Sequence, residues 1–572
     1  MTEQVEYVEN VVVGSGFGGS VAAFRLAEAG REVCVLERGR AFGPGDFARD
    51  PWQGASAFWD PSEGRHGVFD VWSFRGLDAV VSAGLGGGSL IYANVLIRKP
   101  PEWFVKYQPF GGGYEAWPIS REDLEPHYDA VEKMLDAQRF PEGAPGFESV
   151  LKTAAMRDAA RALDRARDFE LPKLAVTFRP EPGKDFGVGL PIVEGSYPNY
   201  HKKDRVTCTL CGQCDLGCNF GAKNTLDHTY LSAAKNTDNA DIRVRTEVRR
   251  IAKAGDGYLV SYVVHDEEHG DGRPHPTRAL EERRIRCRRL CLAAGSLGST
   301  YLLLRNRDEL PGLSTSALGT RFSGNGDYLA VLKGARRPLH ASVGPVITSA
   351  LRTPDSVETR SGSTRGFYVQ DAGYPMVLNW LVEARYGLPF RLLRFSVRRA
   401  WAQISRNPKS ELSSALAQVL GDGATAASST PLLGMGRDVP DGVMRLNRRQ
   451  FLAIDTNSRS SKAYYAGVRE QMQALAEVLG AELKDGFWTT LHRSVTVHPV
   501  GGAPMGTTIQ EAVCDHLGEV FGLDNLFVCD GAVMPGPVGP NPSLTIAAFS
   551  DRMVEAVLND RTRSPMRSRQ MS

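Results

Sequence analysis

Val11-Val12-Val13-Gly14-Ser15-Gly16-Phe17-Gly18-Gly19 begins the stretch that decides the fold of this chain, and the stretch runs on to Glu37. An apolar segment leads into the pattern Gly-x-Gly-x-x-Gly. A helical stretch with small residues then follows as far as Gly30, and a second apolar segment ends on the acid Glu37. This is the order of a strand–helix–strand unit that binds a dinucleotide. Its glycines permit a tight turn, close approach of the backbone to a pyrophosphate, and close packing of helix on strand.

Two further features of this stretch bear on the ligand. The N-terminus of the helix offers free N–H groups and a positive dipole end to phosphates, and Glu37 is placed to accept hydrogen bonds from the adenosine ribose. The chain holds 60 glycines, so a glycine triplet alone would also suit an ordinary glycine-rich turn. Because strand, helix, strand and acid stand in order, the stretch predicts a bound dinucleotide, either NAD or FAD.

Length and composition are those of a globular enzyme with more than one domain. The chain has 572 residues, of which 42% are hydrophobic and 23% charged. Its net charge of +2 argues against a nucleic-acid partner. The longest apolar runs are shorter than a membrane span, and the N-terminus has neither a basic segment nor an apolar signal segment. We therefore expect a cytoplasmic protein whose nine cysteines are thiols or metal ligands rather than disulfides.

Segments that suit a cofactor site are scattered along the chain. They lie at 11–40, at the glycine-rich loop 84–94, at the apolar segment and helix start 291–299, and at 526–548. The stretches between them, 103–219 and 329–490, are rich in aromatic residues and proline. This alternation predicts one cofactor domain that is interrupted by substrate-domain insertions.

The order of these segments, together with three motifs, resembles the glucose-methanol-choline flavin oxidoreductases, in particular their bacterial cholesterol-oxidase-like branch. The motifs are Trp117-Pro118-Ile119 with Asp123-Leu124-Glu125-Pro126-His127-Tyr128, then His498-Pro499-Val500-Gly501-Gly502-Ala503-Pro504-Met505-Gly506, and finally Asp530-Gly531 with Gly539-Pro540-Asn541-Pro542-Ser543-Leu544-Thr545. The resemblance covers nearly the whole chain. It implies an α/β fold in which a Rossmann-like FAD-binding domain is interrupted by an α+β substrate-binding domain with a large antiparallel sheet.

The resemblance also implies a division of the chain and a set of cofactor contacts. FAD-binding segments are expected at 1–44, 76–100, 223–326 and 494–560, and substrate-domain or cap segments at 45–75, 101–205 and 327–493. A cysteine-rich loop is expected at 206–222 and a disordered tail at 561–572. The residues expected to contact FAD are Gly14, Ser15, Gly16, Phe17, Gly18, Gly19, Glu37, Gly86, Gly87, Gly88, Ser89, Asn94, Val248, Ala294, Gly295, Asp530, Gly531, Asn541 and Pro542.

The chemistry of alcohol oxidation gives roles to His498 and Asn541. A hydride leaves carbon for the flavin while the hydroxyl proton departs, and a histidine near its natural pKa suits the acceptance of that proton. By resemblance His498 fills this role, directly or through a water, and Asn541 orients substrate and flavin. The alternative for His498 is a structural histidine at a strand end. Asp530 is expected to contact the ribityl chain or to stabilise its loop, and His492 to be structural.

One segment departs from the pattern of the cholesterol oxidases. These enzymes also isomerise a steroid double bond, which needs a carboxylate base above the ring. The segment that looks equivalent, Tyr374-Pro375-Met376-Val377-Leu378-Asn379-Trp380, holds no acid, and Asp371 and Glu383 are only nearby. Isomerase activity, and cholesterol itself as the substrate, are therefore in doubt.

A cysteine-rich loop is the second departure. Cys208-x2-Cys211-x2-Cys214-x3-Cys218 has the spacing of a ferredoxin-type iron–sulfur loop, although Asn219 stands where a proline often follows. The alternatives are an iron–sulfur cluster (3Fe–4S or 4Fe–4S), a zinc ion and free thiols. Some membrane-associated sugar dehydrogenases of the resembled family carry an iron–sulfur centre, so this loop predicts an electron relay.

A basic amphipathic stretch at 388–405 is the third feature. Leu393, Val397 and Trp401 share one helical face, and Arg391, Arg394 and Arg398 line another. Such a helix suits the surface of an anionic membrane, at its inner face for a cytoplasmic protein. The alternative is a lid helix that packs on the enzyme's own core.

These observations lead to one leading hypothesis and two others. The first is an FAD-dependent oxidoreductase that converts a secondary alcohol on a sterol- or terpenoid-like skeleton to a ketone and passes electrons to O2 or to an external acceptor. The second is a flavin desaturase or a polyol dehydrogenase of the same family. The third is an electron-transfer flavoprotein or redox sensor. The pair His498 and Asn541 argues against it, because a pure electron carrier needs neither residue.

Overall fold

The computed structural model describes residues 5–105, 115–195, 197–266, 273–314, 316–355, 365–375, 424–456, 459–486 and 493–560. The predicted amphipathic stretch at 388–405, Glu383, His492 and the tail at 561–572 lie outside the described residues. Among the described helices, none combines the length and the apolar character needed to cross a bilayer.

The predicted strand–helix–strand unit forms the centre of a seven-stranded sheet. It consists of β1 (Glu6–Val13), α1 (Phe17–Glu28) and β2 (Val33–Leu36), and the two strands are parallel, with Val12 opposite Val35. The strand order is β11-β2-β1-β14-β13-β12, with β23 also paired to β14. The added strands are β11 (Ala240–Arg243), β12 (Thr246–Ala254), β13 (Gly257–Val264), β14 (Arg283–Leu292) and β23 (Leu526–Val528).

Two distant segments join this sheet beside the fingerprint. Strand β14 runs parallel to β1 along its whole length, and β23 runs parallel to the carboxyl end of β14, with Cys291 opposite Phe527. The loops that follow β1, β14 and β23 therefore meet at one edge of the sheet, which is where α/β sheets bind ligands. The structure therefore brings the segments at 291–299 and 526–548 to the sheet that holds the fingerprint.

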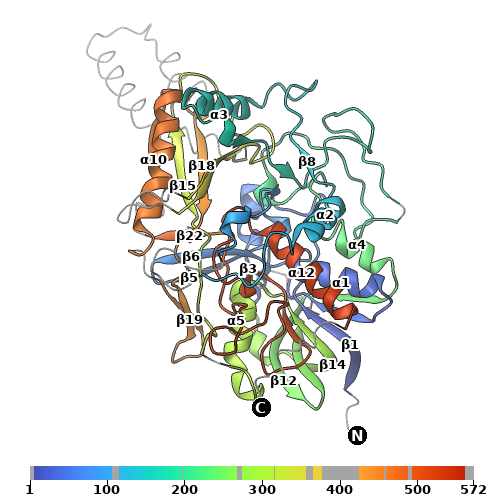
Figure 1. Ribbon diagram of the computed structural model, residues 1–572. Helices are drawn as coiled ribbons and strands as arrows, with labels where there is room; N and C mark the ends of the chain where they lie inside the picture. The colour runs from blue at the N-terminus through green and yellow to red at the C-terminus, as the bar shows by residue number, and fades with distance from the viewer. Residues whose placement is uncertain are drawn as a thin grey trace, which may run out of the picture.

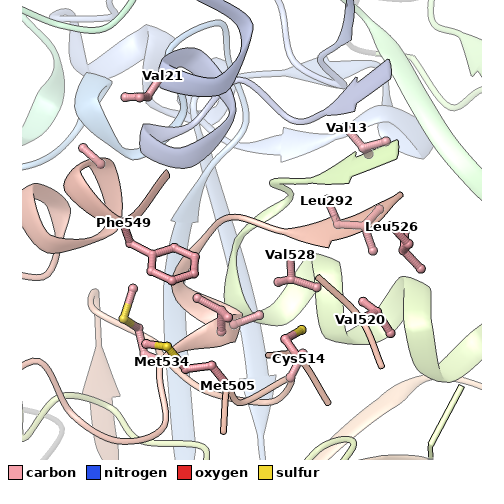
Figure 2. Close-up of a cluster of buried hydrophobic side chains, with 14 of the residues drawn as sticks. Val13, Val21, Leu292, Met505, Cys514, Val520, Leu526, Val528, Met534 and Phe549 are labelled. Atoms are coloured by element: carbon pink, nitrogen blue, oxygen red, sulfur yellow. The ribbon is translucent and has the colours of Figure 1, made fainter. Parts of the chain in front are cut away.

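Helices cover this sheet through closely packed small residues. Helix α1 packs against α12 (Ser543–Leu558) and α4 (Tyr230–Lys235), and α12 also packs against α2 (Glu125–Met134) (Figure 1). A Cβ on Gly18 would lie 1.8 Å from the carbonyl oxygen of Cys529, so only glycine allows this approach. The core beneath contains Leu292, Leu526, Val528 and Phe549, which lie together in Figure 2. Helix α5 (Gly295–Arg305) starts directly after β14.

A second sheet, of six antiparallel strands, forms the other large unit, and the predicted fold class is confirmed. Its strand order is β21-β15-β18-β17-β16-β9. The bounds are β9 (Phe169–Glu170), β15 (Tyr328–Lys333), β16 (Ala350–Thr353), β17 (Phe367–Asp371), β18 (Thr430–Gly436) and β21 (Glu482–Asp485). Helices α3 (Leu151–Ala162) and α10 (Lys462–Leu479) pack against it (Figure 1).

Alternation along these strands separates two faces of the six-stranded sheet. In β15 and β18, Ala330, Leu332 and Leu432 belong to the core shared with α3 and α10. The neighbouring residues Leu329 and Leu433 instead line a cavity on the opposite face. Successive side chains of a strand point to opposite faces, so one strand can serve both the core and the cavity.

Short strands form four smaller sheets in the described part of the chain. Three-stranded sheets are formed by β5 (Phe69–Phe74), β6 (Leu77–Ser82) and β22 (Ser494–Thr496), and by β7 (Val95–Leu96), β8 (Gln138–Arg139) and β10 (Lys173–Leu174). Two-stranded sheets are formed by β3 (Trp59–Asp60) with β4 (Arg65–His66), and by β19 (Val443–Leu446) with β20 (Leu452–Asp455). A four-residue helix, α9 (Ala424–Ala427), precedes β18.

Candidate active site

A cavity of about 1340 Å³ extends from the edge of the seven-stranded sheet to the inner face of the antiparallel sheet. Pockets for one small molecule usually measure about 300–1,000 Å³, so this cavity has room for a large cofactor together with a substrate. Sixteen of the predicted site residues line it: Gly14, Ser15, Gly16, Phe17, Gly18, Glu37, Gly87, Gly88, Val248, Ala294, Gly295, His498, Asp530, Gly531, Asn541 and Pro542.

Four predicted cofactor residues do not line the cavity: Gly19, Gly86, Ser89 and Asn94. Gly19 packs helix on strand, because a Cβ there would lie 2.0 Å from the carbonyl oxygen of Gly14. The Ser89 hydroxyl donates to the carbonyl of Gly86 and accepts from the N–H of Leu226, so it holds the glycine-rich loop in shape. Asn94 has a left-handed backbone, and both polar atoms of its side chain are buried without a hydrogen-bond partner within the described part of the chain. These residues support the cofactor segments from outside the cavity wall.

The fingerprint provides donors and space that suit a dinucleotide. In the described structure no side chain caps the first turn of α1, so its N–H groups remain available at the cavity. Gly87 has φ of +53°, and a Cβ there would lie 2.6 Å from the Cα of Gly16. The carboxylate of Glu37 accepts from the N–H of Ser15 (3.0 Å) and the N–H of Gly39 (2.8 Å) and still has lone pairs for a ribose. The residues present therefore fit FAD.

Asp530 fixes the turn that follows β23. Its carboxylate accepts hydrogen bonds from the N–H of Gly295 (2.8 Å), the hydroxyl of Ser299 and the N–H of Ala532 (2.8 Å). Burial raises the pKa of Asp530 to about 6, and these hydrogen bonds act in the opposite direction. The side chain thus joins the start of α5 to the C-terminal motif, which is one of the two roles expected for it.

His498 lies in the cavity wall and pairs with Asp327. The distance between His498 Nδ1 and Asp327 Oδ1 is 2.8 Å, and the two side chains are only 13% and 5% exposed. The other oxygen of Asp327 accepts from the hydroxyl of Thr496 (3.1 Å) and the N–H of Val497 (2.9 Å). A carboxylate held in this way fixes the orientation and tautomer of the imidazole and leaves Nε2 to exchange a proton.

Asn541 is held by a residue of the antiparallel sheet and by a turn before that sheet. The amide of Gln370, on β17, donates to its Oδ1 at 2.9 Å. The loop before it is fixed by Asn325, which accepts from the N–H of Gly539 (2.9 Å) and donates to the carbonyl of Pro540 (3.0 Å). Because Asn541 accepts at its oxygen, its NH2 group is the part that can donate toward the cavity.

Sequence reasoning missed Asp327 and Gln370. Asp327 follows the turn Gly324-Asn325-Gly326 and precedes β15, so an acid at the entrance of a strand was the available signal. Gln370 is a polar residue in a buried strand, with Tyr368 two positions before it on the same face. Neither position is close in sequence to its partner, and only the fold brings each pair together.

Asp371 has a structural environment. It is fully buried on the helix side of the sheet and accepts hydrogen bonds from the N–H groups of Thr348 (3.0 Å) and Ser349 (2.6 Å) and from their hydroxyls. The ammonium group of Lys152, on α3, lies 3.2 Å from it. Asp371 does not line the cavity, so it is not placed to act as a base above a substrate ring.

The cysteine-rich loop lies next to the flavin segments. All nine cysteines are free thiols in the structure; Cys208 and Cys214 are buried, and Cys211 and Cys218 are half-buried. The only group of three ligand atoms within 4.8 Å of one another in the described structure lies elsewhere, so these thiols are not gathered around a single ion. A tetrahedral zinc ion, with Zn–S bonds of about 2.3 Å, needs a closer grouping than this.

Hydrogen bonds hold that loop against its surroundings. The ammonium group of Lys223 is buried and donates to the carbonyls of Cys214 (2.8 Å), Leu90 (3.0 Å) and Tyr92 (2.8 Å). Asn219, at the position of the missing proline, exchanges two hydrogen bonds with the backbone of Phe47. Burial raises the pKa of Cys214 to about 11 and also raises those of Cys208 and Cys211.

Comparison with known proteins agrees with this geometry. Family models described as GMC oxidoreductase match residues 194–306 and 439–550, and one for an NAD(P)-binding Rossmann-like domain matches 12–72. A cholesterol oxidase from Acinetobacter baumannii is 28% identical over 96% of this chain and 94% of its own length, and one from Mycobacterium tuberculosis is 29% identical over 95% and 89%.

Two more distant proteins also match most of this chain. A long-chain-alcohol oxidase from Arabidopsis thaliana is 22% identical over 96% of this chain and 67% of its own length. The crystal structure of a pyridoxine 4-oxidase (Mesorbium loti) covers 96% of this chain and 99% of its own with a TM-score of 0.57 at 16% identity, which supports the fold alone. The chain belongs to the GMC oxidoreductase family, in its cholesterol-oxidase-like branch, and is an FAD-dependent oxidoreductase that acts on CH–OH groups.

Proposed function

We propose that this enzyme oxidises a secondary alcohol on a bulky, apolar skeleton of the sterol or terpenoid kind to a ketone. The observation that carries the proposal is the pair His498–Asp327 in the wall of a cavity whose far side is the apolar face of the antiparallel sheet. FAD, when bound, supplies the acceptor for the hydride that leaves the carbinol carbon. The protein's own residues hold the hydroxyl group and receive its proton.

His498 accepts the hydroxyl proton in this proposal. Its Nδ1 is paired with Asp327 at 2.8 Å, so Nε2 is the free basic nitrogen. The charge of the imidazolium that forms is balanced by the carboxylate behind it. Asn541, held through its oxygen by Gln370, keeps an NH2 group to position the substrate oxygen. The C–H electron pair leaves with the hydride, and the O–H proton goes to His498, so the reaction balances.

The walls of the cavity favour an apolar substrate. On the side of the antiparallel sheet they include Leu329, Val346, Ile347, Pro431 and Leu433. A polyol would lose its hydrogen bonds to water at such a wall without replacement, which is unfavourable. This supports a sterol- or terpenoid-like alcohol over a polyol. A desaturase of the same family is a weaker proposal, because it needs no acceptor for a hydroxyl proton.

A direct test of the proposal is anaerobic reduction of the bound flavin by candidate alcohols. Sterols and terpenoid alcohols should bleach the flavin faster than polyols, and His498→Ala should slow bleaching by about 10²- to 10⁴-fold. His127→Ala is the matched control, because His127 pairs with Asp551 at 2.6 Å in a buried site away from the cavity. Unchanged bleaching in His498→Ala would remove the assignment and would favour an electron carrier. Rates with and without O2 then distinguish an oxidase from a dehydrogenase.

We also propose that the cysteine-rich loop holds an iron–sulfur cluster that takes electrons from the flavin site. Support comes from Asp215 and Leu216, which belong to this loop and line the same cavity as the fingerprint. Two cations, Arg49 and Lys223, donate to carbonyls of the loop. Their charge acts against the burial that raises the pKa values of Cys211 and Cys214, and it would balance part of the charge of an anionic cluster. A cluster would supply transfer of single electrons.

Metal analysis tests this second proposal. Protein purified without oxygen should contain iron and acid-labile sulfide, and Cys214→Ser should lose both. Cys34→Ser, which replaces a buried thiol of β2, is the control and should retain them. Absence of iron and sulfide from the wild-type protein would leave these cysteines as free thiols and remove the relay.

A further inference from the structure

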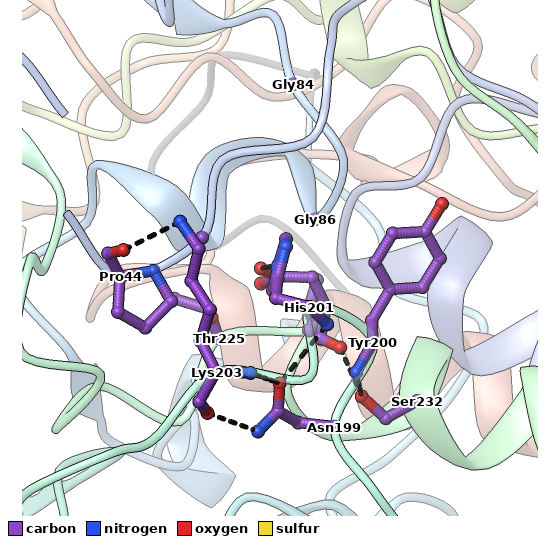
Figure 3. Close-up of polar contacts among 12 residues, drawn as sticks. Pro44, Gly84, Gly86, Asn199, Tyr200, His201, Lys203, Thr225 and Ser232 are labelled. Atoms are coloured by element: carbon purple, nitrogen blue, oxygen red, sulfur yellow. Dashed lines mark hydrogen bonds and ion pairs between the residues drawn. The ribbon is translucent and has the colours of Figure 1, made fainter. Parts of the chain in front are cut away.

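Two histidines and an aspartate meet behind the flavin loop, outside the cavity. Asp227 and His228 lie in the turn before α4, and His201 lies in a loop that also holds Asn199 and Lys203 (Figure 3). His201 Nε2 is 2.6 Å from Asp227 Oδ2, and the rings of His201 and His228 have centroids 5.3 Å apart. One ligand atom from each of the three residues lies within 4.8 Å of the other two. Among the described residues this is the one such group.

Two atoms of this group lack the hydrogen bonds that buried polar atoms normally make. His228 Nδ1 is buried and has no hydrogen-bond partner among the described residues. Asp227 Oδ1 is also buried and has no partner of normal hydrogen-bond geometry there, although the side chain of Thr225 interacts with this carboxylate. Native structures rarely leave such atoms unpaired, and each one calls for an unseen partner. The surrounding backbone, in contrast, is well satisfied. Ser232 donates to the carbonyl of Asp227 and accepts from the N–H of Tyr200, as Figure 3 shows for Tyr200 and Ser232.

We propose that His201, Asp227 and His228 bind one divalent transition-metal ion, for which zinc is a suitable probe. Two imidazole nitrogens and one carboxylate oxygen form a ligand set that zinc and similar ions favour, with the remaining position left to water. The ion replaces the direct contact between His201 and Asp227 and becomes the partner of Asp227 Oδ1 and His228 Nδ1. The His201 side chain is 7% exposed, so it is the member of the pair with Asp227 that lies nearer to solvent.

The site has a structural role, because none of its residues lines the cavity. A Cβ on Gly86 would lie 3.1 Å from Asp227 Oδ1, and the N–H of Leu226 donates to the hydroxyl of Ser89 at 3.0 Å. The segment that carries Asp227 therefore supports the glycine-rich flavin loop from behind. A bound ion links the loop of His201 to the segment that carries Asp227. This stabilising effect does not depend on which alcohol the enzyme oxidises.

Equilibrium dialysis of the chelator-treated flavoprotein against zinc tests the proposal. The wild-type protein should bind one equivalent, and zinc should raise its melting temperature. His201→Ala, Asp227→Asn and His228→Gln should each weaken this binding by at least about tenfold. Asp227→Asn keeps the size of the side chain, and flavin content together with the melting temperature without zinc reports whether each variant is folded.

Two controls separate this site from other zinc ligands. His127→Gln removes a histidine that pairs with an aspartate but has no second histidine in the group, and it should bind zinc like the wild type. Cys211→Ser/Cys218→Ser, which alters the half-buried thiols of the cysteine-rich loop, should also retain the equivalent. The proposal is overturned if the wild type binds no zinc, if folded His201, Asp227 and His228 variants bind it normally, or if only the cysteine variant loses it.

Discussion

At the scale of single residues, the pairing of His498 with Asp327 leads to a prediction about catalysis. Asp327→Asn keeps the size of the side chain but removes the charge that orients the imidazole and balances its proton. We expect flavin reduction by the preferred alcohol to slow by roughly 10- to 10³-fold, less than in His498→Ala. Stopped-flow bleaching of the flavin under anaerobic conditions measures this. Asp551→Asn, in the comparable buried pair with His127, should change the rate little, and an equal loss in both variants would contradict the role of Asp327.

A second residue, Asp438, should make the free energy of unfolding depend on pH. Burial raises the pKa of this carboxyl from 3.8 to about 7, while a hydrogen bond from Ser323 acts in the opposite direction. Between these two pH values the folded protein keeps a proton that the unfolded chain has lost, so stability falls as pH rises through this window. Asp438→Asn cannot titrate. We expect it to gain about 4 kcal/mol relative to the wild type between pH 4 and pH 7.5.

Urea unfolding at a series of pH values measures that change. The control is Asp256→Asn, which removes an exposed carboxylate from the turn between β12 and β13. Parallel pH profiles for Asp438→Asn and the wild type would show that this carboxyl is not the titrating group.

At the scale of secondary-structure elements, we expect substitutions of two neighbouring leucines in strand β18 to have different effects, one on stability and the other on substrate turnover. Leu432 is fully buried against α10, and Leu433 lines the cavity. Leu432→Ala should lower the free energy of unfolding by about 2–5 kcal/mol and leave substrate preference unchanged. Leu433→Ala should cost less stability but reduce kcat/KM for a bulky apolar alcohol by roughly tenfold or more. Urea unfolding and steady-state kinetics on both variants test this, and a larger kinetic effect for Leu432→Ala would contradict it.

The turn between β6 and β7 gives a second prediction at this scale. Gly87 has φ of +53°, and a Cβ there would lie 2.6 Å from the Cα of Gly16 in the fingerprint, so the backbone must move to admit a side chain. We expect Gly87→Ala to be purified with less than half of the normal flavin, judged by the ratio of flavin to protein absorbance. Gly54→Ala is the control, because a Cβ at Gly54 meets no atom within 4 Å. Normal flavin content in Gly87→Ala would show that the loop can adapt.

The distance in sequence between contacting elements explains which parts of the fold and of the site could be predicted. The unit β1-α1-β2 was predictable because its signals, the glycines of the turn and the acid after β2, are local. The segments that form β14 and β23 were predicted as strands that lead into helices, but their pairing with each other was not predicted. In contrast, Asp327 reaches His498, and Gln370 reaches Asn541, only through the packing of two sheets. The motifs indicated His498 and Asn541 but contain no information about partners that are distant in sequence.

At the scale of the whole molecule, a buried network of charges joins distant segments. Glu115 pairs with Arg365 and Arg437, and Arg437 also pairs with Asp355. Glu115→Gln removes a buried carboxylate that pairs with half-buried Arg365, and it leaves buried Arg437 with Asp355 alone. We expect a loss of about 3–5 kcal/mol in the free energy of unfolding, with little sensitivity to salt because Glu115 and Arg437 are buried.

Urea unfolding at low and high salt measures that loss. Asp455→Asn breaks the exposed pair of Arg445 and Asp455 and serves as the control, with an expected change of roughly 0–1 kcal/mol. A loss in Glu115→Gln as small as in the control would show that the network adds little to stability.

The pairing of Leu290 with Leu526 has a consequence for biosynthesis. During translation the fingerprint emerges early, yet β23 and α12 complete the sheet and the cavity only when residues 526–558 have emerged. Until then, the edge of β14 that β23 will cover stays open, and the apolar residues beneath it stay exposed to the aggregation that such edges invite. Flavin capture is therefore a late event, and a ribosome that stalls near residue 500 leaves a nascent chain whose open edge depends on chaperones.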